Sequence, residues 1–578
     1  MAQSDTNLAS LVRQAERPPR WGEPLDPKMG EDTLDMLLAA EPFSQMDASR
    51  FPAGTPLREI LRNDSAVRDY GPGEIILRKD DYGTSAFLVL SGEVDVVIRP
   101  EIDPRLLGRA SRAKKTFVAR LSQLWNNNPE PEGWRKRSPR AGDKKSASLE
   151  KGKTSVYLQD YPRIISGSQS AKLGEGSMFG EISALSRMPR TATVVAASQV
   201  TRLLEFTWEG LRDIMKYDPA LKARIDSIYR QNSLKAFLSN HPLFNHLDDS
   251  SYKELCDAAQ LETYGDYNWS AAYQRLAKDG ETSTSNEPVI VREGDYLNGI
   301  HMIRAGFCRV SRKYGGGERT LNYIGAGSVF GFGEIANHWK KPDDGLQATH
   351  SLRSLGYAHL IFIPTAALEK FANREWAAAE LGSALLPDVA DAGLDEGDEA
   401  PPAGLMEFLA EHRFLNGTKS MVIDMDRCTR CDDCVRACAS THDGNPRFLR
   451  HGPIIDNLMI ANACMHCVDP VCMIGCPTGA IHRTSFSGEV VINPSTCIGC
   501  TACANNCPYD SIRMVEVRSE KGEFLVDEEF QPILKATKCD FCVEQKSGPA
   551  CINACPHDAL SRTNLTRITP IANWLRKN

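Results

Sequence analysis

Cysteine is the residue type whose number and spacing in this sequence point most directly to chemistry. Sixteen of the 18 cysteines in the 578-residue chain lie between Cys428 and Cys555. They form four groups: Cys428, Cys431, Cys434 and Cys438; Cys464, Cys467, Cys472 and Cys476; Cys497, Cys500, Cys503 and Cys507; and Cys539, Cys542, Cys551 and Cys555. Because thiolates bind soft metal ions and metal clusters, these groups predict a metal-binding region.

The spacing inside the groups favours iron–sulfur clusters. Three closely spaced thiolates can hold three irons of a cubane cluster, while a more distant thiolate before proline holds the fourth. Structural zinc sites take two pairs of ligands for each ion, which does not suit such triplets. Disulfides are not expected, because Met1–Gln14 lacks the apolar core of a secretory signal. Sixteen thiolates therefore predict four 4Fe–4S clusters and a chain that transfers single electrons.

The region from Thr418 to Leu565 resembles the four-cluster iron–sulfur subunits of the dimethyl sulfoxide reductase and formate dehydrogenase type. The resemblance is carried by CMHCVDPVCMIGCPTGAI from Cys464, CIGCTACANNCPYDSI from Cys497 and KCDFCVEQKSGPACINACPHDAL from Lys538. It implies two ferredoxin-like halves whose clusters form a chain between a catalytic subunit and an electron donor or acceptor.

The resemblance also implies how the cysteines are shared among the clusters. The first set would be Cys428, Cys431, Cys434 and Cys555; the second Cys438, Cys539, Cys542 and Cys551; the third Cys464, Cys467, Cys472 and Cys507; and the fourth Cys476, Cys497, Cys500 and Cys503. The first two sets would lie in one half of the domain and the last two in the other.

An internal repeat precedes the cysteine-rich region. Glu41–Asp47 recurs as His241–Asp248, and each copy continues into alternating β-branched residues and turn glycines. This pattern predicts an antiparallel β-barrel or jelly roll. Helical stretches at residues 207–238 and 364–385 would close the two copies.

The first copy contains Phe179–Val194, which resembles the phosphate-binding cassette of cyclic nucleotide-binding domains, as in protein kinase A regulatory subunits and the catabolite activator protein. Gly180 would let the backbone approach a ligand, and the short helix after it would offer free N–H groups to an anion. Arg190 could donate two hydrogen bonds to the cyclic phosphate, and Glu181 could accept one from the ribose. The cofactor-binding residues implied are Gly180, Glu181, Ile182, Arg190 and Thr191. Thr191 hints at cGMP, and cAMP remains an alternative.

The second copy departs from the cassette. Phe332–Glu334 is retained, but Leu346 aligns with Arg190, and Asp343 and Asp344 would repel a phosphate. We expect a degenerate domain that docks against the first copy or a partner.

The first copy carries a basic insertion at about 100–154, with fourteen Lys or Arg against four Asp or Glu between Arg105 and Lys153. Few aromatic residues accompany it, so it favours a solvated loop over a nucleic-acid site.

The predicted fold class is multidomain α+β, with two β-roll (jelly-roll) cyclic nucleotide-binding domains followed by a double ferredoxin-like iron–sulfur domain. The predicted boundaries are an N-terminal extension at 1–33, the first nucleotide-binding domain at 34–235, the degenerate second at 236–385, a linker at 386–410 and the cluster domain at 411–578. No apolar run reaches the ~18 residues of a membrane helix, so we expect a cytoplasmic chain, membrane-associated at most through a partner.

Two functions fit these patterns. The first is an electron-transfer subunit, gated by cAMP or cGMP, of an oxidoreductase whose catalytic subunit carries molybdopterin or another cofactor. The alternative is a redox and second-messenger sensor that acts through a protein partner. The sequence has no P-loop, dinucleotide fingerprint or nucleophile elbow, so the chain is not expected to be a complete enzyme, and no catalytic residue is assigned. A homo-oligomer formed through the nucleotide-binding domains is compatible with this organisation.

Overall fold

A computed structural model describes residues 12–99, 102, 156–373, 404–565 and 574, with gaps at 17–19, 23, 159–160, 167–168, 187–188, 266–268, 271–272, 276–286, 316, 341–344, 443, 486, 520–521, 544 and 546–547. The basic insertion, most of the predicted linker and Asp343 and Asp344 lie outside the described residues. Among the residues described, no helix is both long and apolar enough to cross a bilayer.

Spatial contacts divide the chain into two compact units. The first comprises residues 1–229 and 421–562, and the second comprises residues 230–420 and 563–578. The first unit thus joins the first β-roll to the cysteine-rich region, although the second β-roll separates them in the sequence. The domain boundaries given above remain predictions.

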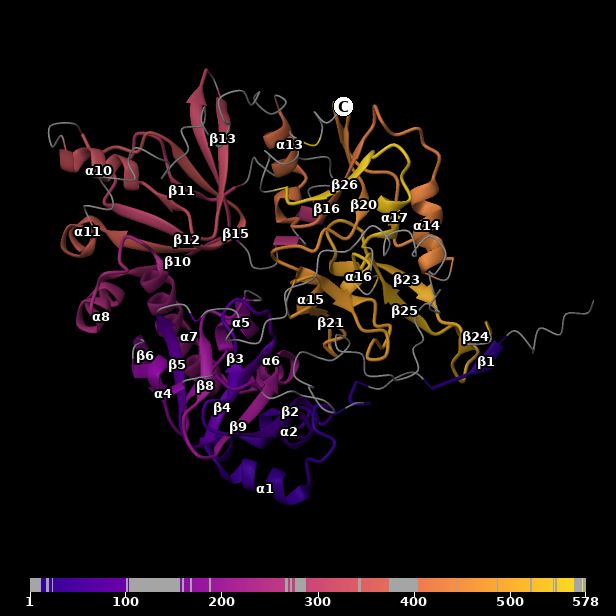
Figure 1. Cartoon of the computed structure of the whole chain (residues 1–578), viewed down its shortest axis with the longest axis horizontal. Helices are drawn as coiled ribbons and strands as arrows, with labels where there is room; N and C mark the ends of the chain where they lie inside the picture. Colours follow the sequence, from indigo (N-terminus) through magenta and orange to yellow (C-terminus); the bar gives the residue numbers. More distant parts are fainter. Residues whose placement is uncertain are drawn as a thin grey trace, which may run out of the picture. The chain divides into compact units, whose positions relative to one another are not determined.

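The first β-roll consists of two four-stranded sheets, with strand orders β2-β9-β4-β7 and β3-β8-β5-β6 (Figure 1). Their bounds are β2 Ser65–Tyr70, β3 Ile75–Leu77, β4 Ser85–Ser91, β5 Val94–Arg99, β6 Gln169–Leu173, β7 Met178–Phe179, β8 Thr193–Ala196 and β9 Thr201–Thr207. Side chains alternate across β4: Phe87 and Val89 join one apolar core, and Ala86 and Leu88 join another. Because both faces of β4 are covered, its sequence is a continuous apolar run rather than an alternating one.

Helices cover the core that contains Ala86 and Leu88. They are α1 Glu31–Ala39, α2 Leu57–Asp64, α6 Trp208–Tyr217 and α7 Pro219–Asn240. Thr207 ends β9 and caps α6, because its side chain accepts a hydrogen bond from the Gly210 N–H. The predicted helical stretch at 207–238 is therefore present as two consecutive helices.

The second unit contains the second β-roll, whose main sheet has the order β10-β15-β12-β13, with β11 pairing with β15 and β14 with β12. The bounds are β10 Gln260–Tyr264, β11 Val289–Val291, β12 Gly299–Tyr314, β13 Gly317–Gly325, β14 Val329–Phe330 and β15 Ser351–Pro364. Helices α8 Asp249–Ala258, α10 Phe332–Lys340, α11 Thr365–Phe371 and α13 Leu405–Glu411 belong to the same unit.

Short strands and helices make up the cysteine-rich region of the first unit. The strands include β16 Ser420–Asp424, β17 Phe448–Leu449, β18 Ile454–Ile455, β19 Leu458–Ile460, β20 Asn462–Ala463, β21 Ile481–Arg483, β22 Val490–Ile492, β23 Arg513–Glu516, β24 Phe524–Val526, β25 Leu534–Thr537 and β26 Leu560–Thr563. The helices are α14 Asp433–Thr441, α15 Val471–Ile474, α16 Ala502–Asn506 and α17 Ala550–Asn553. Each of these helices contains at least one of the sixteen cysteines.

The amino-terminal segment holds the two parts of the first unit together. Strand β1, Val12–Gln14, pairs in parallel with β24, and the two strands lie side by side in Figure 1. Farther along, Arg20 forms an ion pair with Asp213, and the Trp21 indole N–H donates to Asp64 at 3.0 Å. The segment therefore contacts both the cysteine-rich region and the first β-roll.

Candidate iron–sulfur and nucleotide sites

The structure places cysteines of different groups beside one another, and several of these neighbours belong to the same implied set. In the first set, burial raises the pKa of Cys434 to about 11, and the nearby Cys555 and Cys428 thiols contribute to the shift. In the second, burial and the neighbouring Cys539 and Cys551 raise the pKa of Cys438 to about 12. These interactions place the last cysteine group beside the first, as two ferredoxin-like halves require.

The other two sets show the same proximity. Burial raises the pKa of Cys467 well above its usual value, with further contributions from Cys464, Cys472 and Cys507. In the fourth set, burial, Cys497, Cys476 and Cys500 raise the pKa of Cys503 to about 12. Crowded thiols whose anionic forms repel one another are the arrangement that a cationic iron–sulfur core would stabilise.

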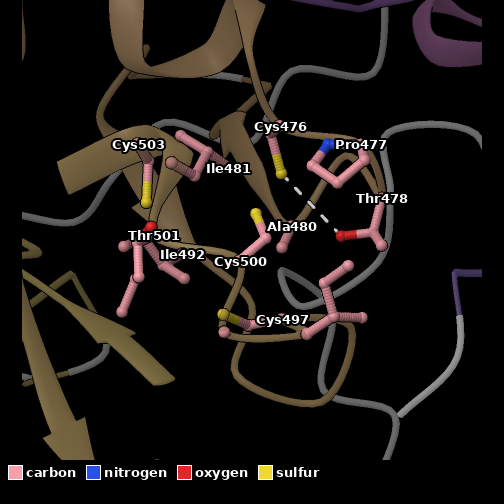
Figure 2. Close-up of a pocket in the computed structure, with 13 residues that line it drawn as sticks. Cys476, Pro477, Thr478, Ala480, Ile481, Ile492, Cys497, Cys500, Thr501 and Cys503 are labelled. Carbon is pink, nitrogen blue, oxygen red and sulfur yellow. Dashed lines mark hydrogen bonds between the residues drawn. The ribbon is translucent and has the colours of Figure 1, made fainter. Parts of the chain in front are cut away.

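The fourth set surrounds a cavity (Figure 2). Its four cysteines line the cavity with apolar residues that include Ile481, Ile492 and Ala536. The left-handed backbone of Gly499, with φ of +72°, curves the loop that carries Cys497 and Cys500. Four thiols around a largely apolar cavity fit the ligand requirement of a 4Fe–4S cluster.

Backbone N–H groups also point at the cysteine sulfurs. Arg447 N donates to Cys438 Sγ at 3.2 Å, and Ala559 N donates to Cys555 Sγ at 3.4 Å. Cys507 receives such bonds from Ser511 and Tyr509. Hydrogen bonds to ligand sulfurs stabilise negative charge on a cluster and are one determinant of its reduction potential.

Two cationic side chains, which the sequence analysis did not identify, also contact these sulfurs. Lys538 Nζ donates to Cys464 Sγ at 3.1 Å, and Arg562 Nη2 donates to Cys539 Sγ at 2.9 Å. Burial lowers the pKa of Lys538, but the Cys464 and Cys472 thiolates raise it, and the balance lies above the usual value. Only the position of Lys538 directly before Cys539 could have indicated its role from the sequence.

The third set supplies a test of the cysteine sharing. We expect Cys472→Ser to lose one cluster's share of iron, because Cys472 is buried beside Cys464 and Cys507 and a serine hydroxyl is a poor substitute for thiolate. Iron analysis and dithionite reduction of anaerobically purified protein would measure the loss. Cys256→Ser is the control, since Cys256 packs against the core of the second unit. Full iron content in Cys472→Ser would contradict the third set.

The nucleotide cassette of the first β-roll is folded around its arginine. Gly180 has a φ of +79°, and α5, Glu181–Ser186, begins directly after it. Arg190 Nη1 donates to the Gly180 carbonyl at 2.8 Å, so the helix start and the arginine lie together. Ile182 and Thr191 are half-buried in the same cassette. Gly180 and Arg190 therefore lie together, with Glu181, Ile182 and Thr191 next to them in the sequence.

Arg190 lies in the interior of the β-roll. It is 5% exposed, and its Nη2 donates to Ser85 Oγ at 3.3 Å. Burial lowers its pKa to about 10, while Glu205, Glu181 and Asp81 favour the charged form. A guanidinium that remains charged in an interior position can bind a phosphate strongly, because solvent screens it weakly there.

The second β-roll has an apolar residue in place of this cation. Leu346 is 5% exposed and belongs to the core of the unit. Glu334, which aligns with Glu181, accepts a hydrogen bond from Thr349 Oγ1 at 2.5 Å.

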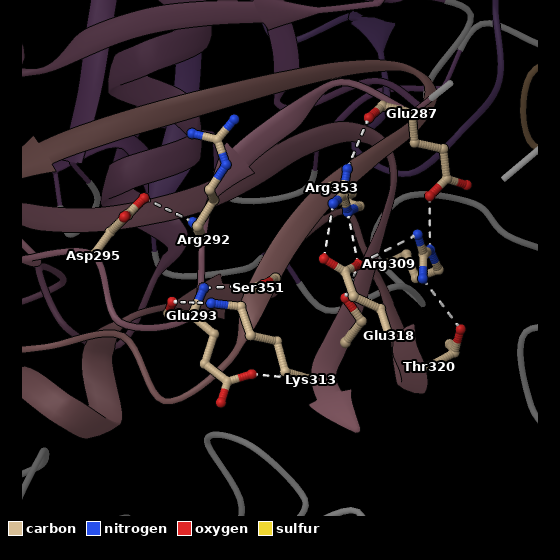
Figure 3. A network of polar contacts seen from close by, with 11 residues as sticks. Glu287, Arg292, Glu293, Asp295, Arg309, Lys313, Glu318, Thr320, Ser351 and Arg353 are labelled. Carbon is tan, nitrogen blue, oxygen red and sulfur yellow. Dashed lines mark hydrogen bonds and ion pairs between the residues drawn. The ribbon is translucent and has the colours of Figure 1, made fainter. Parts of the chain in front are cut away.

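Two arginines of the second β-roll, Arg309 and Arg353, pair with carboxylates (Figure 3). Arg309 Nε lies 2.6 Å from Glu287, and Arg353 Nη2 lies 2.8 Å from Glu318. These arginines join strands β12, β13 and β15, so their charge is already balanced within the domain. The geometry favours the interpretation of this copy as degenerate.

Comparison with known proteins gives matches for both parts of the chain. A family model described as "4Fe-4S dicluster domain" matches residues 455–565, and one described as "Cyclic nucleotide-binding domain" matches 142–218 and 283–375. They confirm the predicted fold class of β-roll nucleotide-binding domains followed by a ferredoxin-like iron–sulfur domain.

Individual proteins also match parts of the chain. "Uncharacterized ferredoxin-like protein YdhX" of Escherichia coli K12 is 35% identical over 176 residues, which cover 28% of this chain and 70% of the relative. "Electron transport protein HydN" of the same strain is 32% identical over 162 residues, covering 24% of this chain and 85% of the relative. The solved regulatory domain of Toxoplasma gondii PKA with cAMP aligns at 13% identity with a TM-score of 0.21, over 62% of this chain and 98% of that chain.

Proposed function

The chain belongs to the ferredoxin-like iron–sulfur electron-transport proteins and carries cyclic nucleotide-binding domains, and from this premise we propose that it transfers electrons through four 4Fe–4S clusters under the control of a bound nucleotide. The four cysteine sets would hold the clusters. Gly180, Glu181, Ile182, Arg190 and Thr191 would bind cAMP or cGMP. The redox partners would be a catalytic oxidoreductase subunit and an electron donor or acceptor.

The exposure of the cysteines supports an electron-transfer path through the cysteine-rich region. Among the sixteen, Cys431 of the first set and Cys500 of the fourth are exposed, whereas the others are half-buried or buried. Electrons would enter near one of these clusters and leave near the other. A sensor would not need a buried chain of clusters between two exposed ones, so this distribution favours electron transfer.

One loop of the first β-roll connects the nucleotide site to the cluster domain, and this observation carries the proposed control. Residues 80–83, which we call the Tyr82 loop, follow β3. Asp80 N donates to the Arg190 carbonyl, and Arg190 N donates to the Asp81 carbonyl, both at 2.8 Å. A Cβ on Gly83 would stand 2.5 Å from Arg190 Nη2, so the loop lies directly against the guanidinium.

The same loop contacts the loops of the third set. Tyr82 N donates to the Ser485 carbonyl at 2.8 Å, and the Tyr82 ring lies 4.9 Å from the guanidinium carbon of Arg483. Arg483 in turn donates to the carbonyls of Cys467 at 2.6 Å and Val468 at 2.8 Å. A phosphate that moved Arg190 would therefore act on Cys467 through two intervening side chains.

A second contact lies beside the fourth set. Arg212 on α6 donates to the Ile474 carbonyl at 3.0 Å. A Cβ on Gly479, which has a φ of +64°, would stand 2.6 Å from Glu209 Oε1. Because Glu209 and Arg212 belong to the helix that follows the β-roll, movement of this helix would also reach a cluster loop.

The proposal predicts that nucleotide affinity depends on the redox state of the clusters. Coupling between two sites is reciprocal and has a typical size of ~1–3 kcal/mol, which is about 5–150-fold in affinity. Anaerobic calorimetry with cAMP and cGMP, on oxidised and on dithionite-reduced protein, would measure it. Equal affinities in both states would refute control through the clusters.

Anaerobic affinity purification with and without nucleotide would identify the redox partner. Recovery of a signalling protein instead would favour the sensor.

Tyr82→Ala should uncouple the two sites. The substitution removes the ring that faces Arg483 but leaves Arg190 and all sixteen cysteines in place. We expect iron content and nucleotide binding to persist while the redox dependence of the affinity disappears. Tyr157→Ala is a matched control, because Tyr157 is an exposed tyrosine of the same β-roll that pairs with Glu74. A redox dependence that survived in Tyr82→Ala would exclude this loop as the connection.

A further inference from the structure

Two cations join the third and second cysteine sets in a reciprocal arrangement. Lys538 Nζ donates to the sulfur of Cys464 at 3.1 Å and to the carbonyl of Cys539 at 3.3 Å. Arg562 donates to the sulfur of Cys539 at 2.9 Å and to the carbonyl of Cys464 at 3.2 Å. Each cation thus contacts the thiol of one set and the backbone of the other. We call this pair the cationic junction.

The junction lies between the two ferredoxin-like halves. Cys464 belongs to the third set and Cys539 to the second, so the contacts bridge the two middle clusters of the proposed chain. Lys538 is 3% exposed, and it also donates to the Val490 carbonyl. Arg562 is half-buried, with its guanidinium carbon 5.7 Å from the centre of the Phe541 ring. Such surroundings screen a charge far less than water does.

A positive charge at the cationic junction affects the reduction potential of the neighbouring clusters. Reduction adds one electron to a cluster, and with its thiolate ligands unchanged the cluster gains one negative charge. A cation that touches a ligand sulfur stabilises the reduced form more than the oxidised form, and net charge and hydrogen bonds to sulfur are among the properties that set cluster potentials. No proton or ligand needs to leave for this effect to operate.

A neighbouring buried lysine offers a comparison with Lys538. Lys535 is 4% exposed and lies on the same strand-to-loop segment as Lys538, but its Nζ donates to the Pro494 carbonyl. Lys538 contacts a cluster thiol and Lys535 a backbone carbonyl, so Lys535 is a suitable control for Lys538.

We propose that Lys538 and Arg562 are positioning residues that raise the reduction potentials of the second and third clusters, so that the two middle clusters of the chain can exchange electrons across the junction. The proposal rests on the assignment of four clusters. It concerns how the reduction potentials of those clusters are adjusted to one another, which neither the family membership nor the nucleotide site determines.

The test is an EPR-monitored potentiometric titration of the full chain, purified anaerobically. For Lys538→Met we expect the equilibrium constants for reduction of two clusters to fall at least tenfold, a shift of about 59 mV or more to lower potential, while the other two clusters keep their values. Lys538→Arg should retain the wild-type potentials, because it keeps the charge. Lys535→Met should leave the potentials of both middle clusters unchanged.

Other outcomes have distinct meanings. Unchanged potentials in Lys538→Met, or an equal shift of all four, would overturn the proposal. If Lys538→Met loses iron, Arg562→Gln decides the question, since it removes the other charge and keeps a donor group; unchanged potentials there would overturn the proposal as well. Fewer than four clusters in the wild-type titration would instead refute the cluster assignment on which the proposal rests.

Discussion

Removal of iron is expected to unfold the cysteine-rich region while both β-rolls remain folded. The strands of this region are at most five residues long, too short to be stable without further support. Its two main cores contain Cys434, Cys438, Cys464, Cys539 and Cys551 in one and Cys472, Cys476, Cys497, Cys503 and Cys507 in the other. Metal binding at structural zinc sites contributes ~10–16 kcal/mol to folding, as much as the whole stability of a typical domain at ~5–15 kcal/mol.

Hydrogen exchange measured by mass spectrometry, before and after anaerobic chelation, would locate the unfolding. We expect amides of residues 421–562 to lose protection and those of β2–β9 to keep it. The β-rolls serve as an internal control, because their cores consist of residues such as Leu88, Leu204 and Ile303 and do not depend on metal. A cooperative melt of the iron-free cysteine-rich region would show that the polypeptide alone stabilises it.

Arg190→Ala is expected to remove nucleotide binding. Loss of one partner from a buried, charge-assisted contact costs ~2–5 kcal/mol of binding free energy. Because ~1.4 kcal/mol of binding free energy corresponds to a tenfold change in affinity, the affinity should fall by about 30-fold or more. Calorimetry with cAMP and cGMP would measure the loss, and iron content should stay at the wild-type value, since Arg190 lies in the β-roll. Wild-type affinity in this variant would place the nucleotide elsewhere.

A matched variant separates this effect from a general loss of charge. Arg202 belongs to the same β-roll but pairs with Asp69 on its surface, where its Nε lies 2.7 Å from the carboxylate and both side chains are about half exposed. Exposed pairs of this kind contribute ~0–1 kcal/mol to stability. Arg202→Ala should therefore bind nucleotide as the wild type does.

The sequence was sufficient for features that depend on local spacing. The intervals between cysteines, the glycine before Glu181 and the arginine nine residues after it all lie within short segments, and the structure assembles each of them. The replacement of Arg190 by Leu346 in the second copy was also visible, and Leu346 lies in a core as an aliphatic residue should.

Contacts between distant segments could not be predicted in this way. Nothing in the sequence around Tyr82 indicates that it would meet Arg483, and nothing around Val12 indicates a parallel pairing with Phe524. Arg562 follows Cys539 by 23 residues, and an arginine at that spacing has no characteristic pattern. Each of these contacts arises because separate folded elements meet, so side-chain chemistry alone does not specify it.

The adjacency of Cys555 to Cys434 has a consequence for biosynthesis. A chain that emerges from the ribosome presents Cys428, Cys431 and Cys434 more than a hundred residues before Cys555. Under the proposed sharing, all cysteines of the third and fourth sets are available once Cys507 has emerged, whereas the second and first sets stay incomplete until Cys551 and Cys555 have emerged. The two middle cysteine groups could thus receive their clusters earlier in translation than the two outer groups, whose ligands lie more than a hundred residues apart.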